Sequence, residues 1–223
     1  MNLYFFVEGR RTEPKVYRAW LGHVFPNLTE VQAISAIRQD HYLMVSGFGY
    51  PQCLNRIDEI LEDIERHGAI DHFFICIDAE EEPAELKIEE LEKRITGRSA
   101  KTACHAIVHN CCFETWFLGN RQMMKRRNIQ GERLRQWKAF YDVRDSCPEL
   151  MGAFSGYRTR AQFHIDYLRE MLGERGLTYS KQHPGEVQKQ SYLKALVERH
   201  ENTSHLQSFG RLLSVWRSLG GSI

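Results

Sequence analysis

The stretch His72-Phe73-Phe74-Ile75-Cys76-Ile77-Asp78 decides the fold class. It is a nearly continuous apolar run, rich in aromatic and β-branched residues, and it ends at a carboxylate. Such a run predicts a strand that is buried on both faces, as in a parallel sheet covered by helices. Three further runs of similar character lie at residues 2–7, 42–45 and 103–108.

Amphipathic helical periods separate these strands. Val16, Trp20 and Val24 recur at a spacing of four after the first strand, and an acidic helix begins near Pro83, which suits a first-turn position. We therefore predict a small doubly wound α/β domain over residues 1–120, with four mainly parallel strands. Residues 121–223 show only helical periods, so we expect a helical extension packed on this core.

Length and composition exclude several classes of protein. The 223 residues (26.2 kDa) suffice for one α/β domain with an extension, and 42% hydrophobic residues exclude a disordered chain. No apolar run approaches the ~20 residues of a membrane-spanning helix. Residues 1–8 lack a basic leader and a cleavage site, so we expect a cytoplasmic protein. The six cysteines form no CxxC pair, which predicts reduced core thiols.

The net charge of +1 conceals a segregation of charge along the chain. Residues 58–92 contain fourteen acidic and two basic residues, whereas residues 121–144 contain eight basic and two acidic ones. An acidic region beside a basic one is compatible with a cation site that faces a polyanion. Solvated helix faces produce the same pattern, so both interpretations stay open.

Carboxylates follow three of the four predicted strands. Glu8 follows the first, Asp78 and Glu80 follow the third, and Glu114 follows the fourth. Ligands of open parallel sheets bind at the carboxyl ends of the strands, and carboxylates with open water positions suit Mg²⁺ or Mn²⁺. In the alternative interpretation, Asp78 caps a loop and residues 80–82 complement the N-terminus of the next helix.

Several motifs together resemble the RloB-like proteins of the Toprim superfamily. Val7-Glu8-Gly9-Arg10-Arg11-Thr12-Glu13-Pro14 resembles the opening motif of that group, and residues 46–51 resemble its glycine-rich turn. Residues 77–80 occupy the place of the Toprim Asp-x-Asp pair. Residues 110–118 are similar to the family segment Asn-Pro-Cys-Phe-Glu-Leu-Trp-Leu. Weaker similarities lie at residues 179–181 and 203–209.

The resemblance implies a Toprim core that acts on phosphodiester bonds with Mg²⁺. In this comparison Asp78 and Glu80 bind the metal, and Glu8 either joins a second metal or acts as general acid/base. Glu80 stands where the family has Asp, so either Glu80 or Glu81 is the ligand. Glu114 would complete a second metal position, or it is a helix N-terminal carboxylate.

Basic residues at three places are candidates for substrate contacts. The first group lies at the start of the first helix, where exposed N–H groups also favour phosphate, and the second lies in the basic region. Lys181 resembles a family position and is implied as a cation that stabilises the transition state. The candidates for substrate binding are Arg10, Arg11, Lys15, Lys125, Arg126 and Arg127.

The resemblance implies a Mg²⁺-dependent nuclease that cleaves DNA, with structured RNA such as tRNA as the second choice. It also implies an effector in antiphage defence, with a sensor ATPase or another defence protein, or a second copy of the chain, as partner. Two alternatives need the same carboxylates. One is a non-catalytic binding or regulatory subunit of a defence complex, and the other is phosphotransfer on small nucleotides.

Overall fold

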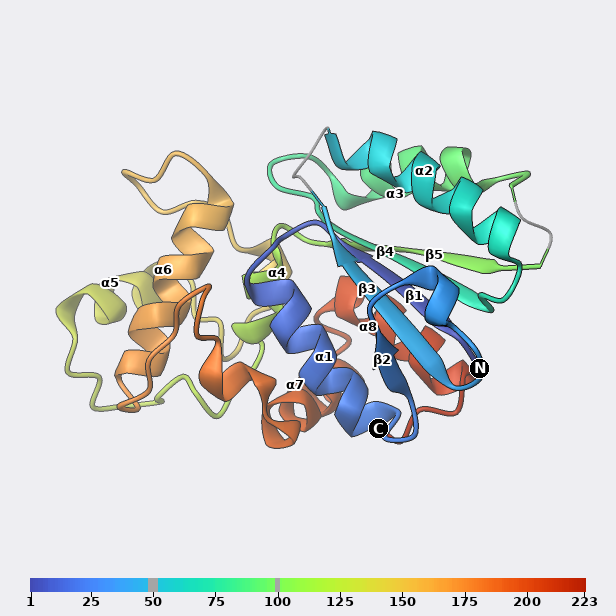
Figure 1. Cartoon of the computed structure of the whole chain (residues 1–223). Helices are drawn as coiled ribbons and strands as arrows, with labels where there is room; N and C mark the ends of the chain where they lie inside the picture. The colour runs from blue at the N-terminus through green and yellow to red at the C-terminus, as the bar shows by residue number, and fades with distance from the viewer. Residues whose placement is uncertain (48–51, 99–100) are drawn as a thin grey trace. The chain divides into compact units, whose positions relative to one another are not determined.

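The computed structural model describes residues 1–47, 52–98 and 101–223 (Figure 1). The chain forms two compact units, each described here by itself. The first comprises residues 1–77 and 83–108, and the second comprises residues 78–82 and 109–223. The boundary predicted near residue 120 falls inside the second unit, and residues 48–51 of the predicted glycine-rich turn lie outside the described part.

A five-stranded, all-parallel sheet forms the centre of the first unit, with the strand order β2-β3-β1-β4-β5. In β1 the last residue, Val7, pairs with Ser46 of β3 on one side and with Cys76 of β4 on the other. The register therefore brings the carboxyl ends of β1, β3 and β4 to the same edge. The strands are β1 (Leu3–Val7), β2 (Thr29–Val31), β3 (His41–Ser46), β4 (His72–Asp78) and β5 (Ala103–His109).

The prediction of four strands is wrong by one edge strand. β2 has three residues, is partly exposed and contains no apolar run, so periodicity does not reveal it. Its parallel pairing with β3 supplies the edge of the sheet instead. The other four strands and their parallel arrangement confirm the doubly wound α/β class.

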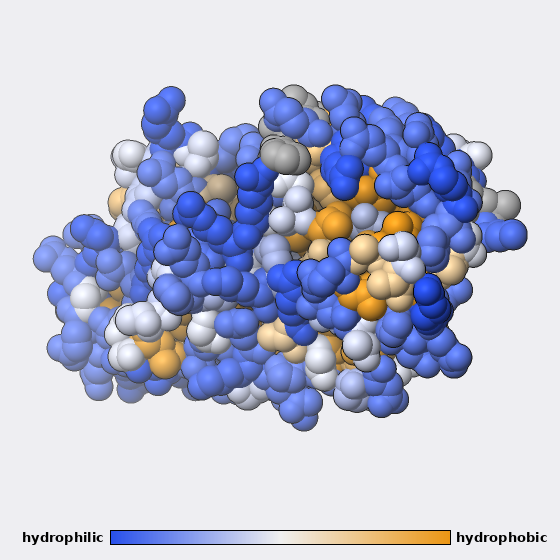
Figure 2. All heavy atoms as spheres, in the orientation of Figure 1, coloured by the Kyte–Doolittle hydropathy of each residue, from blue (hydrophilic) through white to orange (hydrophobic). Residues whose placement is uncertain are grey.

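Helices cover both faces of this sheet. The right-handed crossovers that parallel strands require place α1 on one face and both α2 and α3 on the other. Figure 1 shows α2 and α3 side by side above the sheet, and Figure 2 shows a hydrophilic outer surface on α2 with apolar residues below it over β3. The helices are α1 (Thr12–Val24), α2 (Gln52–His67) and α3 (Ala84–Ile95), with a short 3₁₀ turn at Ile34–Ala36.

Aromatic packing fills the core of the first unit. The rings of Phe5 in β1 and Phe74 in β4 stack at 4.4 Å, and Trp20 of α1 is fully buried. Burial of large aromatic side chains is among the strongest contributions to a core of this size. The apolar runs seen in the sequence are thus the interior of the sheet.

The second unit is helical, and residues 110–223 contain no strand. Trp116 and Trp216 are fully buried in it, and Trp137 packs its ring against Phe163 and Tyr167. These helices confirm the helical periods of the sequence. They are α4 (Phe113–Phe117), α5 (Glu132–Phe140), α6 (Arg160–Gly173), α7 (Gln190–Thr203) and α8 (Gln207–Ser218), with 3₁₀ turns at Pro148–Leu150 and Gly185–Gln188.

A buried arginine links the loops of the second unit. The guanidinium of Arg199 on α7 donates to the Nδ1 atom of His205 at 2.9 Å and to several main-chain carbonyl groups, and burial lowers its pKa to about 10. Its donors are therefore used within the fold. The carbonyl partners are Gly119, Val143, Arg144 and Ser146.

Five of the six cysteines are buried and all six are unpaired. In the described ranges, no helix combines the length and hydrophobicity needed to cross a bilayer.

Candidate functional site

The turn between β1 and α1 carries Glu8 at the edge of the first unit. The amide of Glu8 donates to the carbonyl of Cys76 at 3.0 Å, so the residue continues the pairing of β1 with β4. Val7 pairs with Cys76 of β4, and Glu8 directly follows Val7. Asp78 lies two residues after Cys76, at the end of β4. Both carboxylates therefore belong to the carboxyl ends of neighbouring parallel strands.

Gly9 and Glu13 fix the shape of this turn. The amide of Gly9 donates to Oε1 of the buried Glu13 at 3.0 Å, and a Cβ atom on Gly9 would collide with that carboxylate. The carboxylate folds back on the turn and satisfies an amide that precedes the helix. Sequence reasoning assigned no role to Glu13, and its position in the first turn of the helix was the available signal.

The basic residues that follow Glu8 divide into two kinds. Arg10 donates from Nε to the carbonyl of Gly47 at 3.1 Å, and the amide of Gly47 donates to Val7 at 2.8 Å. Arg10 therefore ties the turn to the end of β3. Arg11, which precedes α1, and Lys15 within it are exposed.

Glu8 also acts electrostatically on the buried thiol of Cys53 in α2. Burial, together with the negative charge of Glu8, raises the pKa of Cys53 to about 11, although the buried ammonium of Lys87 opposes the shift. Cys53 is consequently a neutral thiol at physiological pH. It is a core residue and not a nucleophile.

In the second unit, Asp78 is held by a buried histidine. The Oδ1 atom of Asp78 lies 2.8 Å from Nδ1 of His109, whose side chain is fully buried, whereas the carboxylate is 21% exposed. An ionised carboxylate only accepts, so Nδ1 of His109 carries the proton. The rings of Phe113 and Trp116 pack against the imidazole at 4.8 and 4.6 Å. Sequence reasoning assigned His109 no chemistry, although it ends the last strand.

The segment after Asp78 separates the two alternative ligands Glu80 and Glu81. The main-chain N–H of Arg160, at the start of α6, donates to Oε1 of Glu81 at 2.7 Å, and its side chain donates to the carbonyl of Glu80 at 2.6 Å. The carboxylate of Glu80 is exposed and has no bonding partner within the described ranges. This arrangement favours Glu80, because Glu81 already binds the end of a helix.

Two predicted site residues meet near α4. Glu114 is 2% exposed in the first turn of α4, and its Oε1 atom accepts a hydrogen bond from the hydroxyl of Tyr179 at 2.9 Å. Nζ of Lys181 lies 3.7 Å from the same oxygen, and this side chain is 47% exposed. The pair combines a buried anion with an accessible cation, so Lys181 can extend its charge to a ligand while Glu114 anchors it.

A sulfur and imidazole cluster lies beneath the start of α4. The buried His164 donates from Nε2 to the carbonyl of Met151 at 3.0 Å, so its Nδ1 accepts the hydroxyl of Thr115 at 2.8 Å. The Sγ atom of Cys111 lies 3.4 Å from the same Nδ1. The hydrogen bond between the two thiols lowers the pKa of Cys111 and raises that of Cys112.

This cluster differs in chemistry from the carboxylates. The ligand atoms of Cys111, Cys112 and His164 lie within 4.8 Å of one another. Sulfur and imidazole donors suit Zn²⁺ or another soft cation, and not Mg²⁺. Carboxylate oxygens, such as those of Asp78 and Glu80 in the same unit, are the donors that suit a hard cation.

The basic candidates of the second unit also differ from one another. Lys125 donates to Oε2 of Glu174 at 3.0 Å, and hydrogen bonds from Gly131 and Lys125 lower the pKa of Glu174. Lys125 is therefore engaged within the fold. Arg126 and Arg127 are exposed beside it.

The structure thus brings Glu114 together with Lys181, and it supports Asp78 with His109. Glu8 belongs to the first compact unit and these residues to the second. Comparison of the chain with protein-family models, with curated proteins and with solved structures gave no match.

Proposed function

We propose that the protein is a metal-dependent nuclease that hydrolyses phosphodiester bonds, with Mg²⁺ or Mn²⁺ as its cofactor. The observation that carries the proposal is the parallel register of β1 with β4, in which Glu8 directly follows the last residue of β1 and Asp78 is the last residue of β4. Ligand sites of open parallel sheets occur at such ends. The resemblance of the surrounding motifs to the RloB-like group of the Toprim superfamily supports the same activity.

The donor set fits a hard divalent cation. Asp78 has one oxygen bound by His109, which orients the carboxylate. Glu80 is exposed and Glu8 is partly exposed. When bound, Mg²⁺ would supply charge neutralisation at the phosphoryl oxygens and would acidify a water molecule.

The remaining residues position the substrate and stabilise charge. Lys181, held by Glu114, offers an ammonium to a phosphoryl oxygen as negative charge develops. Arg11 and Lys15 offer cations at the start of α1, where main-chain N–H groups also favour phosphate. In this proposal DNA is the first substrate and tRNA the second, and the protein serves as an effector in antiphage defence.

A cleavage assay with matched variants tests this function. Wild-type protein, Glu8→Gln, Asp78→Asn and Glu81→Gln are each incubated with supercoiled plasmid and with bulk tRNA, in Mg²⁺, Mn²⁺ or EDTA. We expect metal-dependent cutting by the wild type and a loss on the order of 100-fold or more in Glu8→Gln and Asp78→Asn, because these remove charge at the reacting centre. Glu81→Gln is the control and should cut nearly as well as the wild type.

Two results would contradict the proposal. Cutting that persists in both Glu8→Gln and Asp78→Asn would show that the carboxylates are not catalytic. Turnover of mononucleotides without damage to either polymer would indicate phosphotransfer on small nucleotides instead.

A further inference from the structure

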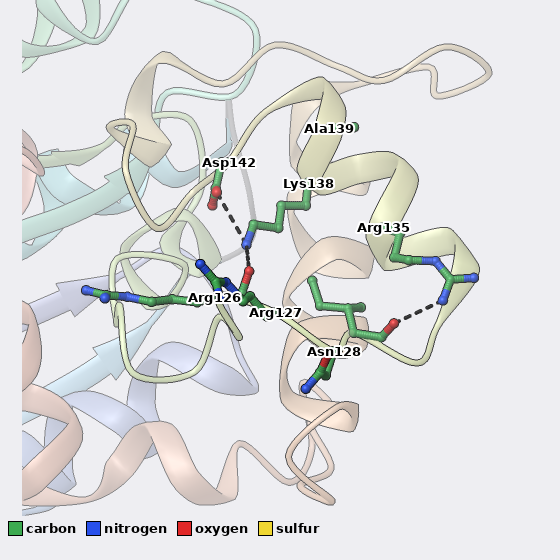
Figure 3. A pocket seen from close by; sticks show the side chains of 8 residues that line it. Arg126, Arg127, Asn128, Arg135, Lys138, Ala139 and Asp142 are labelled. Atoms are coloured by element: carbon green, nitrogen blue, oxygen red, sulfur yellow. Dashed lines mark hydrogen bonds and ion pairs between the residues drawn. The ribbon is translucent and has the colours of Figure 1, made fainter.

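A pocket of about 400 Å³ lies in the second unit, between the loop at residues 126–129 and α5 (Figure 3). It contains four cationic side chains and one carboxylate, so its net charge is strongly positive. Its volume is near the lower end of the ~300–1,000 Å³ typical of ligand sites. The lining residues are Arg126, Arg127, Asn128, Ile129, Arg135, Lys138, Ala139 and Asp142.

Two of the four cations hold the wall of the pocket. The Nζ atom of Lys138 donates to the carbonyls of Lys125 and Arg126, each at 2.9 Å, and lies 3.5 Å from the carboxylate of Asp142. Arg135 donates from Nη1 to the carbonyl of Ile129 at 3.0 Å. The dashed lines in Figure 3 show both side chains directed at the loop backbone. Lys138 and Arg135 are thus positioning residues.

The other two cations are available to a ligand. Arg126 and Arg127 are exposed, and within residues 1–47, 52–98 and 101–223 neither guanidinium has a hydrogen bond or an ion pair. Figure 3 shows both side chains on the side of the loop away from Arg135. Asn128, at φ 59°, turns the chain sharply after them, in a conformation that asparagine tolerates. Two neighbouring guanidinium groups are therefore presented from a loop that α5 holds in place.

The chemistry of these groups selects the ligand. A guanidinium donates two parallel hydrogen bonds to phosphate oxygens, and two adjacent ones can share a single phosphate. Ile129 and Ala139 add apolar surface beside them, which suits a sugar or a base. An anion that combines a phosphate with such a group fits the pocket better than a carboxylate side chain does.

We propose that this pocket is a phosphate subsite, in which Arg126 and Arg127 together hold one backbone phosphate of a nucleic-acid strand. The proposal deepens the nuclease function and rests on it for the identity of the polymer. Lys125 has no part in the subsite, because its ammonium is bound to Glu174. The subsite sets the position of the strand and takes no part in bond cleavage.

Salt-dependent binding tests the subsite without any cleavage. The full-length protein is titrated against fluorescein-labelled duplex DNA and against labelled tRNA in EDTA, over a range of NaCl concentrations, with anisotropy as the readout. The logarithm of the dissociation constant rises linearly with the logarithm of the salt concentration. The slope is about 0.9 for each phosphate of duplex DNA that the protein neutralises. We expect Arg126→Gln/Arg127→Gln to weaken binding roughly tenfold and to lower the slope by about one.

Matched variants exclude a general effect of charge. Arg66→Gln/Arg169→Gln removes the same net charge from exposed arginines that are paired with Asp63 and Asp166. This control should bind the labelled DNA within about twofold of the wild type, because it removes no phosphate contact. Thermal unfolding of each variant confirms that it is folded.

The outcomes separate this proposal from the nuclease function. Wild-type affinity and slope in Arg126→Gln/Arg127→Gln would overturn the subsite, even if Glu8-dependent cleavage is found. A loss of affinity equal to that of the charge-matched control, or a slope lowered by two, would also overturn the proposal that the two arginines share one phosphate. If the variant bound both polymers as well as the wild type but had lost binding of AMP, the assignment of the ligand as a polymer would be overturned. A lowered slope in the variant, combined with no cutting by the wild type in the assays with Mg²⁺ and Mn²⁺, would keep the subsite and contradict the nuclease function.

Discussion

Arg199 and the pair Arg126 and Arg127 carry the same side chain in the same unit, with opposite surroundings. Arg199 is buried, and main-chain carbonyls and His205 accept its hydrogen bonds. Arg126 and Arg127 are exposed beside a pocket and have no such partners in the described part of the chain. The comparison teaches that the same type of side chain maintains the fold at one position and is available for binding at another.

The strongest test of this division is Arg199→Met. The substitution leaves several buried carbonyl groups without a donor, each of which costs about 1–3 kcal/mol if it stays unsatisfied. We expect the free energy of unfolding to fall by about 3–5 kcal/mol in urea denaturation. Arg211→Met, an exposed arginine on α8, is the control and should change it by less than about 0.5 kcal/mol. A decrease of less than about 1 kcal/mol in Arg199→Met would contradict the view that Arg199 maintains the fold.

A smaller effect is expected from the pH dependence of the same cluster. Burial and the charge of Arg199 lower the pKa of His205 below its usual 6.5. The Nδ1 atom accepts a hydrogen bond from Arg199, which requires a neutral imidazole ring. The unfolded chain therefore takes up the proton first as the pH falls. The contribution of His205 to the free energy of unfolding is fully present above about pH 6.5 and decreases below it. Urea unfolding at pH 7.5 and 5.5 measures this decrease.

The control for the pH effect is His205→Asn, which keeps an acceptor without a titrating ring. We expect the variant to lose less stability than the wild type between these two pH values. An identical decrease in both proteins would show that His205 is not linked to the acid sensitivity of the fold.

The smallest effect on stability is expected at the pocket. Arg126→Gln/Arg127→Gln removes exposed side chains without partners in the described ranges, so the free energy of unfolding should change by no more than about 0.5 kcal/mol. The same variant is expected to lose binding, which would complete the contrast with Arg199. A destabilisation above 1 kcal/mol would mean that these arginines also maintain the fold.

Strong local patterns account for the parts of the fold that the sequence predicted. Residues 72–78 are buried on both faces, so their apolar run is continuous, and the acidic helix after Pro83 shows a clear amphipathic period. The edge strand Thr29–Val31 lacked both signals because it is short and partly exposed. Its existence depends on pairing with β3, which is a tertiary interaction.

The candidate site was less predictable because contacts distant in the sequence define it. Glu8 and Asp78 were placed at strand ends by the pattern alone. The hydrogen bond from His109 to Asp78 joins residues 31 positions apart, and that from Tyr179 to Glu114 joins residues 65 positions apart. The sequence of the basic region also does not show which of its cations are engaged, since only the fold reveals that Lys125 is bound to Glu174.

The second unit takes residues 78–82 from within the first, and this affects how the protein is made on the ribosome. Residues 1–77 and 83–108 can complete their sheet as soon as they have emerged. The five intervening residues must wait for later partners, since the amides of Ala79 and Glu80 bond to His109 and Cys111, and Arg160 follows later still. At about 5–20 residues per second, the rest of the chain takes on the order of ten seconds to synthesise. The segment that carries Asp78 therefore acquires its native surroundings later than the strand it follows, as residues 109–160 emerge.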